Sequence, residues 1–166
     1  MKAKLLPPNN ELDLLFRIDP SSPSGLVWKS SETKAGSDNG TGHFQVKIGK
    51  SKYLTSRIIY QLANNVVLQA SEIVDHIDGN PLNNDSSNLR IATKQQNCRN
   101  TIKKSGKSKY RGVSFSASRK TKKWMATIRI GTKLKYPGRF VTEEEAAKAY
   151  DEAARKIDSV FYNTNF

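Results

Sequence analysis

The sequence predicts an α+β protein in two parts: a β-rich N-terminal region ending in a strand–loop–strand–helix unit, then a three-stranded antiparallel sheet packed on one helix. Three observations predict this class. Short apolar segments separated by turn residues fill the first 60 positions, and a strand–loop–strand–helix pattern follows within residues 73–101. An alternating strand at 124–130 then leads to a helix whose start is marked by a capping box.

Short elements open the first part. Residues 12–18 are apolar and leave strand and helix open as alternatives. A loop rich in Pro, Ser and Gly at 20–25 precedes a short strand at 26–28. These features predict a β-rich start of the chain before the first hairpin.

A β-hairpin is predicted over residues 43–54. The side chains of 43–48 alternate between polar and apolar, and Gly49-Lys50 reverses the chain into a second strand. The alternation turns the apolar residues inward and leaves His43 on the side that meets water or nucleic acid. The residues expected to face inward are Phe44, Val46 and Ile48.

The most informative pattern lies in residues 73–101. Residues 74–80 place an acid and a histidine side by side on a strand, followed by a reversal containing Gly, Asn and Pro. A second strand is predicted at 89–92, after which Thr93 can N-cap a helix. The preceding helix, predicted at 56–64, is expected to pack under the first of these strands.

The side chains of this unit suit metal-assisted hydrolysis of a phosphodiester. Asp75 offers a carboxylate and Asn97 an amide oxygen, which are ligands that a hard cation such as Mg²⁺ prefers. Histidine titrates near neutrality, so His76 can take a proton from water. Neighbouring strand residues point to opposite faces, so base and cation can flank the phosphate.

These residues resemble the motif of the HNH nucleases, specifically the phage-type HNH homing endonucleases. The resemblance implies that Asp75 and Asn97 bind the metal, that His76 is the general base, and that Asn88 braces the loop and orients His76. Many relatives carry histidines where Asp75 and Asn97 stand, which favours Mg²⁺ or Mn²⁺ over Zn²⁺ here. The segments that carry the resemblance are Val74–Asn80, Asn83-Asn84, Asn88-Leu89-Arg90 and Gln96-Asn97.

Each of these residues also has an ordinary explanation. Asp-His pairs and Asp-Gly-Asn turns are common in proteins, and a single histidine is more often structural than catalytic. The nuclease prediction therefore depends on the combination of Asp75-His76 with Asn88 and Asn97 at these separations.

Positive charge is concentrated in one stretch of the chain. The whole chain carries a net charge of +13, and residues 105–140 contain eleven Lys or Arg and no Asp or Glu. A stretch without any carboxylate is not typical of a solvated protein face, and it predicts a phosphate-binding surface. The polar, basic segment 102–109 is predicted to be a linker, either simply flexible or lying along DNA.

A sheet and a helix are predicted after this linker. Strands are expected at 110–115, 124–130 and 136–140, and Thr142 with Glu145 forms a capping box at the helix start. Alanines recur on one side of the helix and would let it lie close to the sheet. The other face of the sheet is then left for the basic residues.

This second part resembles an AP2 domain over about residues 108–166. The resemblance implies DNA contacts at or near Arg111, Arg119, Trp124, Thr127, Arg129 and Tyr136. Relatives often carry an arginine at Ser114 and an acid at Thr127, so base preference is not transferred. The segments that carry the resemblance to the AP2 domain are Tyr110–Val113, Trp124–Arg129, Gly138–Phe140 and Thr142–Ala154, with Asn165-Phe166 at the end.

Further basic residues complete the predicted DNA-contacting set. Those outside the resemblance are Arg90, Lys94, Arg99, Lys133, Lys135 and Arg139. For Arg111 and Arg129 the ordinary alternatives are surface solubility or a pair with the acids of the helix. Trp124 is expected to lie in the core in preference to stacking on bases, because its strand neighbours Ala126 and Ile128 are apolar.

Together these features predict a metal-dependent HNH endonuclease at 1–101, the linker 102–109, and an AP2-like DNA-binding domain at 110–166. The expected partner is double-stranded DNA, with Mg²⁺ or Mn²⁺ as cofactor, no small-molecule cofactor, and a monomer favoured over a dimer. The alternative is a non-catalytic DNA-binding transcriptional regulator with a degenerate HNH fold. One cysteine, no signal peptide and no membrane span predict a soluble intracellular protein of a bacterial or phage-infected cell.

Overall fold

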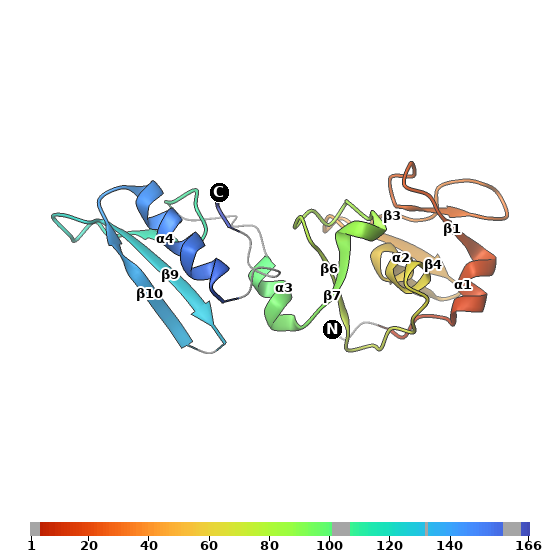
Figure 1. Cartoon of the computed structure of the whole chain (residues 1–166). Coiled ribbons are helices and arrows are strands. Elements are labelled where there is room, and N and C mark those ends of the chain that lie inside the picture. Colours follow the sequence, from red (N-terminus) through yellow and green to blue (C-terminus); the bar gives the residue numbers. More distant parts are fainter. Residues whose placement is uncertain (1–3, 101–106, 132, 158–163) are drawn as a thin grey trace. The chain divides into compact units, whose positions relative to one another are not determined.

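The computed structural model describes residues 4–100, 107–131, 133–157 and 164–166, without the side chains of Gln95 and Arg99. Its contacts divide the chain into two units, Met1–Lys94 and Gln95–Phe166 (Figure 1). This division falls earlier than the predicted linker, most of which lies outside the described residues. The predicted domain bounds therefore stay a prediction, and each unit is described by itself.

The first unit contains three small antiparallel sheets and two helices among its described residues. The sheets pair β1 with β2, β4 with both β3 and β5, and β6 with β7. Its elements are α1 (Asn9–Leu15), β1 (Phe16–Ile18), β2 (Leu26–Trp28), β3 (Ser37–Asp38), β4 (Phe44–Ile48), β5 (Ser51–Leu54), α2 (Thr55–Ala63), β6 (Ile73–His76), the 3₁₀ turn η1 (Ser86–Asn88) and β7 (Leu89–Ala92).

These elements bear out most of the local predictions for this part. The apolar segment 12–18 is both helix and strand, because α1 ends at Leu15 and β1 begins at Phe16. The hairpin is formed by β4 and β5, and Val46 is its most buried inward residue. The helix α3 (Lys94–Asn100) begins directly after Thr93, as predicted.

Helix α2 supports the strands that carry the Asp-His pair. Its Ile58 and Ile59 are fully buried in the core, and the helix contacts β4, β5, β6 and β7. The buried guanidinium of Arg57 donates hydrogen bonds to the carbonyls of Gln69 and Glu72, just before β6 begins. The helix therefore fixes both the face and the starting point of that strand (Figure 1).

The second unit contains a three-stranded antiparallel sheet with one helix packed on it. The strand order is β10–β9–β8, and α4 contacts all three strands. The elements are β8 (Val113–Phe115), β9 (Trp124–Ile130), β10 (Lys133–Phe140) and α4 (Glu143–Arg155). Both hydrogen bonds of the predicted capping box between Thr142 and Glu145 are present.

Two strand predictions need correction. The strand expected from Tyr110 begins only at Val113, because Gly112 takes a positive φ of 68° and turns the chain over the ring of Tyr150. The strand expected from Tyr136 begins earlier, at Lys133, and passes an irregularity between Lys135 and Gly138. Pro137 lies within this irregularity, where a strand can accommodate a residue without an N–H.

A buried carboxylate anchors the end of the chain in this unit. Asp151 of α4 is 1% exposed and accepts hydrogen bonds from the backbone and side chain of Asn165 and from the backbone of Phe166. Asn165 in turn exchanges hydrogen bonds with the backbone of Arg111. The helix, the tail and the turn before β8 are thereby held together.

Within the described part of the chain, none of the helices has the length and apolar character needed to cross a membrane.

Candidate functional site

Asp75 forms a buried ion pair with Arg90 across the β6–β7 sheet. The two residues are direct register partners. Both Nε and Nη2 of Arg90 approach the same carboxylate oxygen, Oδ2 of Asp75, at 3.0 and 2.9 Å. Asp75 is 4% exposed, so this carboxylate is held in place by a charge partner inside the protein.

His76 occupies the next position on β6 and is also buried, at 6% exposure. Its Nε2 lies 3.0 Å from the side-chain oxygen of Asn84. The side-chain nitrogen of Asn84 lies 3.2 Å from both the carbonyl oxygen of Ser24 and the hydroxyl of Thr55. Asn84 therefore joins the histidine to a loop of the first 25 residues and to the start of α2.

These contacts define the tautomer of His76. The carbonyl of Ser24 can only accept, so the nitrogen of Asn84 must face it and the oxygen of Asn84 must face His76. That oxygen can only accept as well, so Nε2 carries the hydrogen. In the neutral ring Nδ1 then holds the lone pair, and it is the nitrogen that can take up a proton.

Asn88 braces the loop that follows β6. Its side chain accepts a hydrogen bond from the backbone N–H of Asp78 and donates to the Asp78 carboxylate and to the carbonyl of Asn83. Its backbone carbonyl accepts from Ile77. The predicted role of Asn88 in orienting His76 stays a prediction, since the hydrogen bond described for the ring of His76 goes to Asn84.

Asp78 is the acceptor around which this loop is folded. Burial alone would raise the pKa of its carboxyl, but hydrogen bonds from Asn83, Asn80 and Asn88 outweigh burial and hold that pKa below its usual range. The loop is therefore built on a charged carboxylate at neutral pH, close to the exit of the strand that carries His76.

His43 lies against His76, which sequence patterning did not indicate. The alternation of the hairpin assigns His43 to the outer side, but the structure leaves it only partly exposed, with its ring centroid 6.1 Å from that of His76. His43 precedes β4 and keeps part of its surface exposed, so the expectation is confirmed only in part, because the ring also packs against His76 of a different sheet. No local pattern could have predicted this contact. The only signal is that the sequence contains just two histidines, His43 and His76.

The residues predicted to bind the cation are only partly tested by the structure. Asn97 lies on α3, which groups with the second unit, so its position relative to Asp75 is not described. Oxygen donors from a carboxylate and an amide suit a hard cation, but Arg90 already engages one oxygen of Asp75 and would compete for it. Among the described residues, no group of three or more His, Cys, Asp or Glu side chains could hold a metal ion.

Cross-strand register separates the predicted DNA-contacting residues of the second unit. Partners across strands share a face. Arg139 pairs with Met125, on the face of β9 that also carries Thr127 and Arg129 and that points away from the buried Ala126. This outer face therefore carries two of the predicted arginines.

The lysines of β10 lie on the other side of the sheet. Lys133 pairs with Ile130 and Lys135 with Ile128, which is buried in the core that α4 covers. Both lysines are nevertheless exposed, because β10 is an edge strand. The expectation that all basic residues gather on one face is therefore wrong for these two.

The remaining predicted contacts have varied surroundings. Arg90 is engaged with Asp75, and Trp124 packs against the core of the second unit beside Phe115, as the apolar alternative predicts. The side chain of Arg99 lies outside the described residues. Those with exposed or partly exposed side chains are Lys94, Arg111, Arg119, Thr127 and Tyr136.

Comparison with known proteins shows what parts of this chain are similar to. Residues 53–99 match the HNH endonuclease family. An uncharacterised HNH endonuclease of Acanthamoeba polyphaga mimivirus is 34% identical over 126 residues, which are 76% of this chain and 64% of that protein. An ethylene-responsive transcription factor of Arabidopsis thaliana is 36% identical over 99 residues, which are 57% of this chain and 59% of that protein.

The chain spans less than two thirds of the length of each of these relatives. The matched segment contains Asp75, His76, Asn84 and Asn88, and so covers the contacts described for β6, β7 and the loop between them. The similarity to the HNH endonuclease family is therefore shown for residues 53–99, the part of the chain that carries these contacts.

Proposed function

We propose that this protein is a metal-dependent DNA endonuclease of the HNH homing type, which nicks double-stranded DNA at a site selected by its AP2-like second unit. The observation that carries this proposal is the position of His76 on β6, beside Asp75 and inside the segment that matches the HNH endonuclease family. The similarity of the chain to a protein named as an HNH endonuclease supports it.

His76 is the general base in this proposal. Asn84 accepts the hydrogen of Nε2, so Nδ1 is the ring nitrogen proposed to take a proton from the attacking water. The water oxygen bonds to phosphorus and the bond to the 3′ oxygen breaks, leaving 5′-phosphate and 3′-hydroxyl ends. One such site per chain predicts a nick from a monomer.

Asp75 and Asn97 are the proposed ligands of Mg²⁺ or Mn²⁺. A divalent ion held by these oxygens would supply positive charge to the phosphoryl oxygens and the departing 3′ oxygen. Arg90 holds Asp75 in a fixed orientation through Oδ2.

The second unit is proposed to supply most of the affinity for DNA. Residues 105–140 contain no carboxylate, so their basic side chains have no acidic neighbours within the segment. Arg129 and Arg139 share the face of the sheet that points away from α4. A sheet can enter the major groove of B-form DNA, whereas the major groove of A-form RNA is too narrow, which favours DNA.

Incubation of supercoiled plasmid or host-gene DNA with the full chain and Mg²⁺ tests this function. We expect conversion to the open-circular form with Mg²⁺ or Mn²⁺, no conversion in EDTA, and a loss of at least about 1000-fold in His76→Ala. Equal nicking by the wild type and His76→Ala would contradict the assignment of the base.

A non-catalytic DNA-binding regulator is the second candidate. The Asp75–Arg90 ion pair favours it, because a carboxylate already paired with an arginine is a weaker cation ligand. Similarity to a protein named as a transcription factor also favours it. DNA binding without metal-dependent nicking of any DNA offered would select this candidate.

A further inference from the structure

The chain contains two histidines, and the fold brings them together. His43 precedes β4 and His76 ends β6, yet their ring centroids lie 6.1 Å apart with the ring planes inclined by 51°. The two strands belong to different sheets, so the contact results from tertiary packing. His43 also lies outside the segment that matches the HNH endonuclease family.

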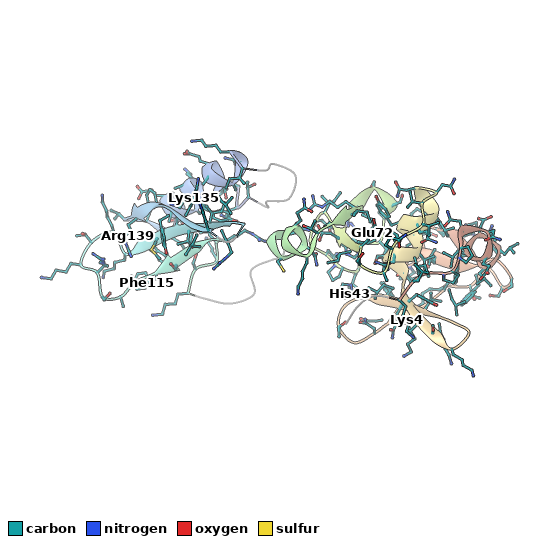
Figure 2. All side chains as sticks on the ribbon, turned by 90° about the horizontal axis from the view of Figure 1, so that it is seen from below. Lys4, His43, Glu72, Phe115, Lys135 and Arg139 are labelled. Atoms are coloured by element: carbon teal, nitrogen blue, oxygen red, sulfur yellow. The ribbon has the colours of Figure 1, made fainter. Side chains whose placement is uncertain are left out.

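The loop before β4 holds His43 in this position. The backbone N–H of Asn39 donates to the carbonyl of His43, and the N–H of His43 donates to the side chain of Asn39. A Cβ atom added at Gly42 would lie 3.8 Å from Pro81, so this loop borders the loop that follows β6. His43, which is labelled in Figure 2, is therefore held close to the end of β6, where His76 lies.

The exposure of the two rings differs. His76 is 6% exposed, whereas His43 is only partly buried. The ring of His43 is therefore the more exposed of two adjacent imidazoles. An imidazole in this position has an N–H that can be donated to an anionic oxygen.

His43 is also suited to act without charge. Burial and the neighbouring His76 lower the pKa of its ring, and the charge of Asp38 opposes them only in part. A neutral ring does not repel the proton that His76 takes up, and it still carries one N–H donor. His76 and Asp38 are the titratable neighbours described for His43.

We propose that His43 is a second catalytic imidazole of the nuclease site, which donates a ring N–H to a non-bridging oxygen of the scissile phosphate while His76 takes the proton of the attacking water. This inference rests on the proposed function. The water oxygen bonds to phosphorus, the bond to the 3′ oxygen breaks with its electron pair, and that oxygen takes a proton from solvent. The N–H hydrogen stays on His43 throughout, so the ring stabilises the added negative charge.

Single-turnover nicking by the full chain, with saturating protein and a plasmid that the wild type nicks, measures this role. We expect His43→Ala to lower the rate about 100-fold while the Kd for DNA changes less than about 3-fold. His43→Gln keeps an N–H donor of similar reach, so we expect it to recover about 10-fold of that loss. Thr41→Ala is the matched control in the same loop, and we expect less than about a 3-fold change.

The outcomes separate this inference from the proposed function. Wild-type nicking by His43→Ala together with an inactive His76→Ala would overturn the role of His43 and leave the nuclease assignment intact. Nicking that His76→Ala does not impair, or no nicking by the wild type, would overturn both. Equal losses in His43→Ala, His43→Gln and Thr41→Ala would show that loop order matters and not the imidazole.

A second measurement observes the ring directly. Because the chain has two histidines, His76→Ala leaves the imidazole of His43 as its only histidine signal in a ¹⁵N NMR spectrum. We expect this signal to shift when a duplex spanning the mapped nick is added in EDTA. A signal unchanged by saturating duplex would overturn the contact between His43 and the phosphate.

Discussion

Asn84 is the side chain on which the orientation of His76 most directly depends. Asn84→Ala removes the acceptor of the Nε2 hydrogen and the donor to the buried carbonyl of Ser24. We expect a loss of about 1–3 kcal/mol in the free energy of unfolding, measured by urea denaturation. The exposed neighbour Asn83 offers the control, and Asn83→Ala should cost less than about 1 kcal/mol.

The ring of His43 should also make stability depend on pH. Its pKa is lowered in the folded protein from the ordinary value of 6.5, so the unfolded chain binds this proton more tightly. Its stabilising contribution is therefore complete above pH 6.5 and is lost as the pH falls through that value. We expect stability to fall between about pH 7 and pH 5.

A variant of His43 tests whether its ring causes this pH dependence. The pKa of Asp78 is held below its ordinary value of 3.8, which lies outside the window. His43→Gln should therefore flatten the dependence of the urea midpoint on pH between about 7 and 5. An unchanged slope in this variant would contradict the assignment.

Gly112 is required by both its backbone conformation and its surroundings. A Cβ at this position would overlap the ring of Tyr150 and lie 2.7 Å from the carbonyl oxygen of Thr127, at a φ of 68°. We expect Gly112→Ala to destabilise the second unit by at least about 2 kcal/mol. Gly131 has a φ of 60° with nothing within 4 Å of the added Cβ, so Gly131→Ala should cost only about 1 kcal/mol in the same thermal or urea assay.

Among the elements, β9 and β10 decide which basic side chains share a surface. Arg129 and Arg139 lie on the face away from α4, while Lys133 and Lys135 share the face that packs the helix. We expect Arg129→Ala with Arg139→Ala to weaken DNA binding at least about 10-fold. The slope of log K against log salt should fall by about 0.9 for each phosphate that the variant no longer neutralises.

The lysine pair provides the matched control for this strand arrangement. Lys133→Ala with Lys135→Ala removes the same charge from the same sheet, and we expect less than about a 3-fold change in Kd. Equal losses from both double variants would show that net charge matters and not the face. Fluorescence anisotropy with a labelled duplex at several salt concentrations measures both quantities.

Across the whole molecule, binding and chemistry should be separable. The basic residues of 105–140 lie in the second unit, whereas Asp75 and His76 lie in the first. We expect EDTA and His76→Ala each to abolish nicking while changing the Kd for DNA less than about 3-fold. Loss of DNA binding in EDTA would contradict this division, because Lys and Arg bind phosphates without a metal.

The local elements were largely predictable because they depend on the periodicity of apolar residues and on capping residues at helix ends. The alternation around Val46 predicts the hairpin, and Thr142 with Glu145 predicts the start of α4. Strand ends were less predictable. Because the chain must pass over Tyr150 at Gly112, the extended backbone begins three residues later than expected, and that ring comes from a helix far along the sequence.

The site itself was predicted only as a set of residue types. The sequence places an acid and a histidine in adjacent positions of one strand, and the structure confirms that both lie on β6. The sequence could not show that Arg90 engages Asp75, although the strand register makes the two residues direct partners. It also gave no reason to prefer Asn84 over its neighbours as the partner of His76, since that choice depends on burial against Ser24 and Thr55.

From the order of its residues alone, this chain specifies two parts, the strand–loop–strand–helix unit of 73–101, and a basic segment without carboxylates. Tertiary structure alone decides that His43 meets His76, that Asn84 defines the tautomer of the histidine, and that β10 divides its basic side chains between two faces. The physical reason is that periodicity and capping act within a few residues. Contacts between sheets depend on how separate elements pack, which no short stretch of sequence records.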